Sequence, residues 1–135
     1  MNLLKETGSN FLTTLGIRLT ELTPEHAVAE MDFRPELQQL TGVLHTGALL
    51  SLADTTATYA SMRVVDPSGA SSDPRFPLAV QISANLVGNV REGTVTAESR
   101  PIHRGRTMIV VETTVRDSDG RLLATVTTTH LALNR

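Results

Sequence analysis

The fold of this chain is decided by one stretch, Gly42-Val43-Leu44-His45-Thr46-Gly47-Ala48-Leu49-Leu50-Ser51-Leu52-Ala53-Asp54-Thr55-Thr56-Ala57-Thr58-Tyr59-Ala60. Beyond Gly47 it contains neither Gly nor Pro, and its apolar and small side chains recur every three or four residues. That spacing is typical of a helix that buries one face. The run Asp66-Pro67-Ser68-Gly69 ends the pattern. We therefore expect one long helix over residues 46–64, roughly 28 Å long at about 1.5 Å per residue.

Shorter elements flank this helix. Before it, residues 2–15 predict a short helix, and residues 17–22 and 27–33 predict two strands. After it, strands are predicted over residues 78–87, where apolar side chains alternate, and over residues 94–99, 107–115 and 121–133. Short turns between the later strands require antiparallel pairing. This order predicts an α+β fold, in which an antiparallel sheet of about six strands wraps around one long central helix.

Composition narrows the class of protein. A chain of 135 residues is expected to form a single domain over residues 1–135. Its hydrophobic content of 40% and charged content of 19% indicate a soluble globular protein. A net charge of −2 and an aromatic content of 3% argue against binding to nucleic acid.

The chain also lacks the signals of several kinds of site and location. Without cysteine it has no disulfide, no thiolate nucleophile and no cysteine-bound zinc, and no two histidines have the spacing of metal ligands. We expect no metal. No stretch approaches the roughly 20 apolar residues of a membrane span. The first eight residues include Glu6 and Gly8 where a signal peptide is apolar, so a cytoplasmic location is expected.

The long helix carries two groups that suit acyl transfer. The amides of Thr46 and Gly47 at its start offer unpaired N–H donors and partial positive charge to an oxyanion. Asp54 is a lone carboxylate, but it lies eight residues beyond Thr46, about 12 Å along the axis. One substrate carbonyl cannot reach both groups of the same helix. Two antiparallel helices across a twofold axis can supply both, which predicts two equivalent sites at a dimer interface.

His45-Thr46-Gly47, with Ala53-Asp54-Thr55 following, resembles the hotdog-fold thioesterases, in particular the PaaI-like (phenylacetic-acid-degradation) branch. The resemblance runs from about Gly16 to the C-terminus. It implies a hotdog fold and hydrolysis of acyl-coenzyme A, without metal or cofactor. It also implies a homodimer, or a homotetramer built as a dimer of dimers.

The same resemblance implies roles for individual residues. Asp54 matches the family's nucleophile or general base, and the Thr46 amide matches the donor that polarises the thioester carbonyl. Gln39 matches the amide that positions the substrate, at a place where Asn is usual. Thr46 replaces the first Gly of a His-Gly-Gly motif, and Ala79 stands where a Ser or Thr often assists water.

Three groups of residues have two interpretations. His45 is a substrate contact or general acid, or it is a structural residue that holds the start of the helix. Arg104 and Arg106 either bind coenzyme A phosphates or form a solvated turn. Asp54 also fits a Ser-x-x-Asp capping box with Ser51, although the apolar period already begins at Leu49, which places Ser51 inside the helix.

Two other functions remain open at this stage. One is an acyl-CoA-binding sensor without catalysis, and the other is a hotdog hydratase or dehydratase that uses His45 with a carboxylate. The absence of Gly-x-Ser-x-Gly disfavours a serine-elbow hydrolase. The acyl group is not encoded in any recognisable pattern.

Overall fold

The structure is a computed structural model that describes residues 10–70, 73 and 75–134. Its elements are α2 (Phe11–Leu15), β1 (Arg18–Leu22), β2 (Ala27–Asp32), the 3₁₀ turn η1 (Pro35–Leu37), α3 (Thr46–Val65), β3 (Phe76–Leu86), β4 (Thr94–Arg104), β5 (Met108–Arg116) and β6 (Leu122–Leu133). The long helix predicted over residues 46–64 is confirmed as α3, which begins at the expected residue and ends one residue later.

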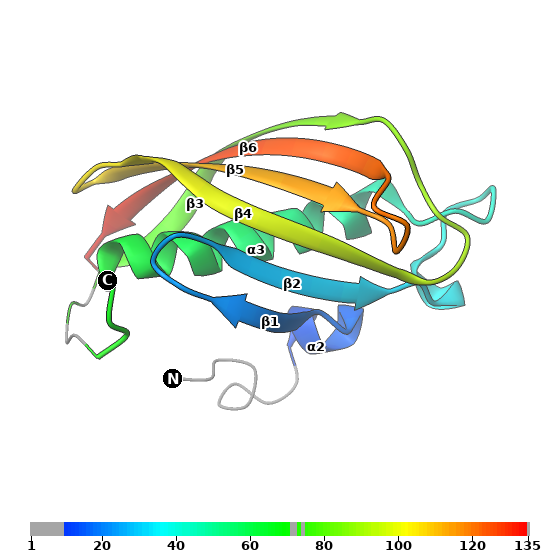
Figure 1. The fold of residues 1–135 in the computed structure, drawn as a ribbon, viewed down its shortest axis with the longest axis horizontal. Helices are drawn as coiled ribbons and strands as arrows, with labels where there is room; N and C mark the ends of the chain where they lie inside the picture. The colour runs from blue at the N-terminus through cyan, green and yellow to red at the C-terminus, as the bar shows by residue number, and fades with distance from the viewer. Residues whose placement is uncertain (1–9, 71–72, 74, 135) are drawn as a thin grey trace.

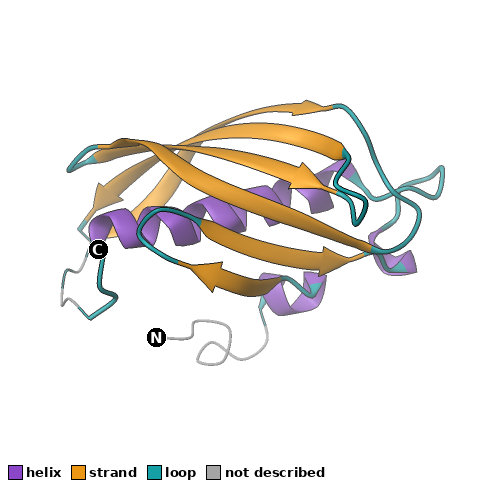
Figure 2. Ribbon diagram, in the orientation of Figure 1, coloured by secondary structure: helices purple, strands orange, loops and turns teal. Residues whose placement is uncertain are grey.

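The strands form one sheet in the order β1-β2-β4-β5-β6-β3, with every neighbouring pair antiparallel. The sheet curves around α3, which runs along its concave side (Figure 1). Figure 2 shows the same arrangement as one layer of strands over one long helix. This architecture confirms the predicted hotdog fold.

The core lies between α3 and the sheet. On α3 the buried side is built from Leu49, Leu52 and Ala53, which cluster with Met31 of β2 and Val95 of β4, and from Ala57, which belongs to a second cluster that includes strand residues of β2 and β5. Because alanine side chains are small, the helix packs close to the strands at Ala53 and Ala57. Burying each large aliphatic side chain contributes about 1.5–3 kcal/mol.

The remaining side of α3 is a stripe that the sheet does not cover. Its less buried residues recur at helical spacing along the first four turns: Gly47, Leu50, Ser51, Asp54, Thr55 and Thr58. Most of these side chains are small, so another helix could approach the stripe closely. We call these six residues the open stripe.

Strand β3 is an edge of the sheet, and its apolar side chains are exposed. Leu78, Val80, Ile82 and Leu86 are 39–56% exposed. The alternation predicted over residues 78–87 is interrupted by a register shift between Ala79 and Gln81. Ala79 pairs with His130 on β6, and Ile82 pairs with Thr128. Because paired residues share a face of the sheet, Ala79 and Ile82 both lie on the face toward α3. Before the register shift the odd-numbered residues of β3 therefore face α3, and after it the even-numbered residues do.

Three predicted boundaries were wrong. β4 continues to Arg104 instead of ending at Ser99, with a register shift between Pro101 and His103 that accommodates the proline. β3 begins at Phe76, because an edge strand tolerates Pro77. Asn10 caps α2, which starts at Phe11, whereas the part of the predicted helix before residue 10 lies outside the described residues. None of the described helices is long and apolar enough to cross a membrane.

Candidate active site

The start of α3 is organised by His45. It is the N-cap residue, with φ −62° and ψ 135°, and its ring Nδ1 accepts a hydrogen bond from the Gly47 amide at 2.7 Å. A Cβ on Gly47 would lie 2.9 Å from that Nδ1, so only glycine leaves room for the ring. In the neutral ring the proton is then on Nε2. His45 thus holds the start of the helix, as one of its two interpretations required.

The Thr46 amide is left without an acceptor. The amides of Ala48 and Leu49 bond to the His45 carbonyl at 2.9 and 3.3 Å, and the Gly47 amide bonds to the His45 ring. Nothing in the described part of the chain accepts a hydrogen bond from Thr46 N–H. This donor sits at the positive end of a helix of 20 residues. Of the two amides expected to face a substrate, Thr46 is therefore the available one.

Asn89 fixes the backbone just before the helix. Its Oδ1 accepts from the amides of Leu44 and Val90 at 3.1 and 2.8 Å, and its Nδ2 donates to the Leu44 carbonyl at 2.9 Å. Arg121 in turn donates to the Asn89 carbonyl at 2.6 Å. This role of Asn89 cannot be predicted from the sequence, because a loop asparagine 45 residues from Leu44 carries no local signal of the contact.

Gln39 lies in the loop that leads to His45. Its side-chain Oε1 accepts from the Thr41 amide at 3.0 Å, and its Nε2 donates to the Thr41 hydroxyl. Arg91 holds the same loop by donating to the Thr41 carbonyl at 2.8 Å. Gln39 is thus placed near the start of α3, with its amide engaged within its own loop.

Asp54 is the ninth residue of α3 and lies on the open stripe. Its Oδ1 is buried and has no hydrogen-bond partner among the described residues. Burial raises the pKa of the Asp54 carboxyl, and the charge of His130 opposes that rise. Asp54 as a whole is half-buried, but a carboxylate oxygen buried without a partner is costly, which makes Asp54 a candidate for a functional role. The capping-box interpretation was wrong, because Ser51 lies inside α3 and donates to the Gly47 carbonyl at 2.7 Å.

His130 on β6 is a titratable neighbour whose charge acts on Asp54, and its sequence position gives no sign of this. It is fully buried on β6, with Nε2 2.8 Å from the Thr128 hydroxyl and Nδ1 3.4 Å from the Pro77 carbonyl. Burial lowers the pKa of the His130 ring, while the Pro77 carbonyl and the Asp54 charge raise it. Asp54 and His130 are 76 residues apart in the sequence, so only the β3–β6–α3 packing reveals that they interact.

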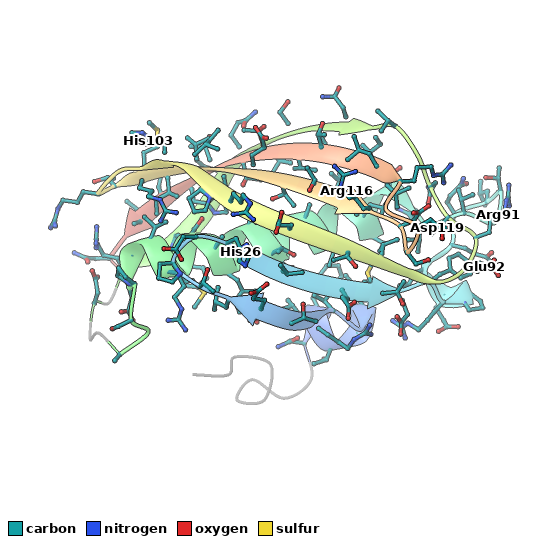
Figure 3. All side chains as sticks on the ribbon, in the orientation of Figure 1. His26, Arg91, Glu92, His103, Arg116 and Asp119 are labelled. Atoms are coloured by element: carbon teal, nitrogen blue, oxygen red, sulfur yellow. The ribbon has the colours of Figure 1, made fainter. Side chains whose placement is uncertain are left out.

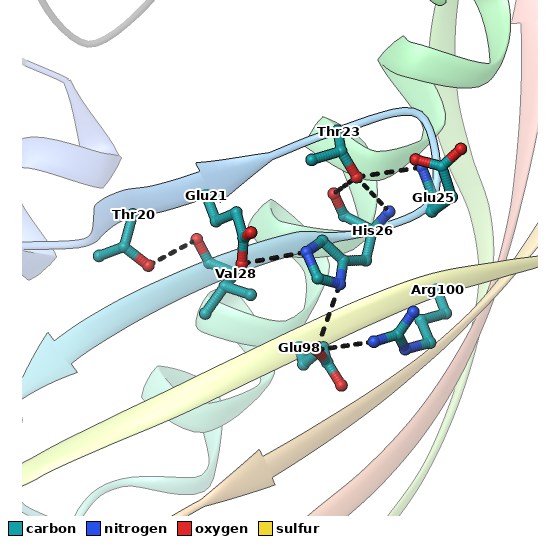
Figure 4. Close-up of polar contacts among 8 residues, drawn as sticks. All are labelled: Thr20, Glu21, Thr23, Glu25, His26, Val28, Glu98 and Arg100. Atoms are coloured by element: carbon teal, nitrogen blue, oxygen red, sulfur yellow. Dashed lines mark hydrogen bonds and ion pairs between the residues drawn. The ribbon is translucent and has the colours of Figure 1, made fainter.

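The other two histidines lie away from this site. His26 has ion-pair contacts with Glu21 at 3.0 Å and Glu98 at 3.4 Å, and Glu98 also contacts Arg100 (Figure 4). His103 is exposed near the turn that joins β4 to β5 (Figure 3). Within the described residues no three His, Asp or Glu side chains form a group that could hold a metal ion.

Arg104 and Arg106 lie at the other end of α3. With Arg63 and Val65 from the last turn of the helix and Arg75 from the segment before β3, they line one cleft. Arg104 donates to the Pro24 carbonyl at 2.7 Å. The structure therefore groups Gln39, His45, Thr46 and Gly47 at the start of α3, and separates Arg104 and Arg106 from them.

Fold and site together define a hotdog-fold protein whose central helix begins with a free amide and carries a lone carboxylate. A family model described as the thioesterase superfamily matches residues 41–124. The match covers more than half of the chain and includes both Thr46 and Asp54. The chain belongs to the thioesterase superfamily.

Individual relatives agree with this assignment. ComA2 of Bacillus subtilis, named as a candidate esterase, is 36% identical over 112 residues, which are 83% of this chain and 85% of ComA2. The crystal structure of thioesterase HI1161 from Haemophilus influenzae has a TM-score of 0.86 at 27% identity, covering 98% of this chain and 89% of that one. A hypothetical thioesterase from Streptococcus pneumoniae, solved with coenzyme A, has a TM-score of 0.75 at 18% identity, covering 88% and 87%. This last likeness concerns the fold alone.

Proposed function

We propose that this protein is an acyl-CoA thioesterase whose two active sites lie across a homodimer interface. Asp54 of one subunit either attacks the thioester carbonyl or takes a proton from the water that attacks it. The Thr46 amide of the other subunit donates to the oxyanion that forms. The carbon–sulfur bond then breaks, coenzyme A leaves as the thiol, and water supplies the oxygen of the free acid.

One observation carries this proposal: α3 bears an unbonded Thr46 amide and an unpaired Asp54 Oδ1, both among the described residues. A donor at a helix start stabilises developing negative charge, and a carboxylate of raised pKa suits proton abstraction. The two groups are eight residues apart, about 12 Å along one helix. A single carbonyl needs both within roughly 3 Å, so the groups must come from two helices.

The surface of the subunit supports such a dimer. The open stripe lets a second α3 approach antiparallel, which would bring each Thr46 beside the other subunit's Asp54. Next to it, the edge strand β3 exposes Leu78, Val80, Ile82 and Leu86. An uncovered apolar edge strand is otherwise a liability, and pairing β3 with its copy would cover it. A dimer of dimers would use a further face.

The remaining site residues have supporting roles in this proposal. His45 and Gly47 keep the first turn in place, so that the Thr46 amide points away from the helix. Gln39 orients the acyl thioester from the preceding loop. An acyl-CoA substrate is supported by membership of the thioesterase superfamily and by a protein of the same fold, the pneumococcal hypothetical thioesterase that was solved with coenzyme A.

The test is thiol release from a panel of aromatic and aliphatic acyl-CoAs. Asp54→Asn keeps the shape of the side chain and removes the charge, so we expect a loss of roughly a hundredfold or more in kcat. Asp119→Asn, in the exposed turn between β5 and β6 (Figure 3), is the matched control and should retain full activity. Wild-type rates in Asp54→Asn would refute the role of Asp54. An enoyl thioester that is hydrated without thiol release would instead indicate a hydratase, and tight binding without turnover a sensor.

A further inference from the structure

The end of the molecule at the C-terminus of α3 carries a cleft that the proposed chemistry does not use. Its cavity of about 410 Å³ is lined by nine residues: Pro24, Arg63, Val64, Val65, Pro67, Arg75, Arg104, Gly105 and Arg106. They come from four separate segments, namely the β1–β2 turn, the end of α3 with Pro67 just beyond it, the segment before β3, and the end of β4 with the β4–β5 turn. We call this the arginine cleft.

The charge of the cleft is concentrated. Four of the chain's 12 Lys and Arg residues line it, and none of its lining residues is acidic, although the whole chain has a net charge of −2. Such a local excess of like charge destabilises a folded protein unless an anion or solvent compensates it. The arrangement therefore favours a negatively charged ligand.

Two of the arginines build the walls. Arg75 forms an ion pair with Asp73 at 2.9 Å and donates to the Arg106 carbonyl at 2.5 Å, which joins the segment before β3 to the β4–β5 turn. Arg104 donates to the Pro24 carbonyl at 2.7 Å and joins β4 to the β1–β2 turn. These contacts hold the rim of the cleft in place.

The other two arginines are available for a ligand. Neither Arg63 nor Arg106 has a side-chain hydrogen bond or ion pair within the described part of the chain. The Arg63 guanidinium lies against Gly69, where a Cβ would come within 1.9 Å of Nη1, so the glycine makes room for it. Guanidinium groups suit phosphate because their paired N–H donors match its oxygens.

We propose that the arginine cleft binds the phosphate groups of a nucleotide, with Arg63 and Arg106 as the direct contacts. The cavity is larger than one phosphate needs, and the apolar residues Pro24, Val64 and Pro67 give it a surface for a sugar or base. The nucleotide is either the phosphate-bearing end of acyl-CoA or a separate nucleotide. If the ligand is the phosphate-bearing end of acyl-CoA, this proposal rests on the proposed thioesterase function.

The positions of Asp54 and Arg63 on α3 bear on whether the nucleotide is part of acyl-CoA or a separate molecule. Arg63 follows Asp54 by nine residues, about 13 Å along the axis and two and a half turns, so the two side chains leave opposite sides of α3. A substrate that used both would have to bend around the end of a helix. A separate nucleotide would not.

The direct test is calorimetric titration with adenosine 3′,5′-bisphosphate, which has the phosphates of a nucleotide but no thioester arm. We expect Arg63→Ala and Arg106→Ala each to raise Kd roughly tenfold or more, and added salt to weaken binding. Arg100→Ala is the matched control, because it removes an arginine that pairs with Glu98 on β4 (Figure 4). No binding to the wild-type protein, or an equal loss in Arg100→Ala, would overturn the proposal.

Kinetics then separate the sources. If the cleft holds the substrate, both cleft variants raise KM for acyl-CoA and leave KM for the matching acyl-pantetheine unchanged. If the nucleotide is separate, the variants lose nucleotide binding and both KM values stay the same. Equal changes for both substrates would contradict phosphate recognition. A wild-type protein that hydrolyses neither substrate would refute the thioesterase proposal alone, since the titration still decides the cleft.

Discussion

The Gly47 amide donates a 2.7 Å hydrogen bond to Nδ1 of His45, and this contact defines the start of α3. It uses the second amide of the helix and leaves the first, that of Thr46, unbonded among the described residues. The His-x-Gly spacing therefore has a mechanical explanation. The ring caps the helix, the glycine leaves room for the ring, and the residue between them presents its N–H outward.

A double-mutant cycle tests this pairing. His45→Ala should cost about 1 kcal/mol of unfolding free energy, the usual value of an N-cap, and His45→Asn should recover most of it. Gly47→Ala should stabilise the His45→Ala protein, because alanine is the better helix former, but not the wild type, where the new Cβ meets the ring. Urea denaturation at fixed protein concentration measures the unfolding free energy of the four proteins of the cycle and of His45→Asn. Additive effects would show that the two residues do not interact.

Asn89→Ala should lower both stability and activity. The change removes three hydrogen bonds that hold Leu44 and Val90. The Leu44 amide keeps the Val90 carbonyl as an acceptor, but the part-buried Leu44 carbonyl and Val90 amide lose their partner, which costs about 1–3 kcal/mol. The loop before α3 should then loosen and kcat should fall, because Thr46 is no longer held in position. Thermal unfolding and thiol release measure the two effects. Asn134→Ala, in the exposed residue after β6, is the control and should change neither.

The pH dependence of stability should report the burial of Asp54. Burial raises the pKa of its carboxyl above the ordinary 3.8, so the folded protein holds this proton more tightly than the unfolded chain. Stability is therefore lost as pH rises from 3.8 through the raised pKa. Asp54→Asn cannot ionise, and its stability relative to wild type should increase across that window and then stay level. A relative stability that does not change as pH rises from 3.8 to neutrality would contradict a raised pKa of Asp54.

His130 should change the pH dependence of stability in the opposite direction from Asp54. Burial lowers the pKa of its ring below the ordinary 6.5, so the unfolded chain takes up this proton first as pH falls. The protein should lose stability as pH falls below 6.5 toward the lowered pKa. His130→Gln retains hydrogen-bonding capacity toward Thr128 without this titration. Unfolding free energies on the acid side should therefore fall less steeply for the variant, and parallel curves would refute this role of His130.

The sequence predicts the fold well where a pattern is local. The helix beginning at Thr46 is legible because no Gly or Pro interrupts it after Gly47, and the turn between β5 and β6 is legible from Asp117-Ser118-Asp119-Gly120. Two strand boundaries were predicted wrongly because prolines were taken to end the strands. Pro77 lies inside an edge strand, and Pro101 is absorbed by a register shift in β4. Neither accommodation can be read from the prolines themselves.

The candidate site was predictable only in part, for the same reason. His45, Thr46, Gly47 and Asp54 share one helix, so their spacing in the sequence fixes their spacing in the structure. His130 acts on Asp54 from β6, and Asn89 holds Leu44, just before the helix, from the loop after β3, across separations that no periodicity encodes. Arg63 and Arg75 join Arg104 and Arg106 in the same way, through the packing of distant segments.

In the proposed dimer, each active site takes Asp54 from one subunit and the Thr46 amide from the other. Thr46→Pro removes the N–H of that amide, together with the threonine hydroxyl. Proline is accepted at the first position of a helix, and the preceding residue, His45, already has the extended ψ of 135° that proline requires. Thr46→Pro and Asp54→Asn should each be inactive as homodimers while remaining folded.

The most direct measurement is the thiol-release rate after coexpressing these two variants under different tags and isolating the mixed dimer. Each mixed dimer has one site with both defects and one site with an intact Asp54 and an intact Thr46 amide. We therefore predict about half of the wild-type rate per dimer, as a twofold pair of shared sites requires. A mixed dimer as inactive as its parents would contradict the account, because it would place both groups of each site in a single subunit.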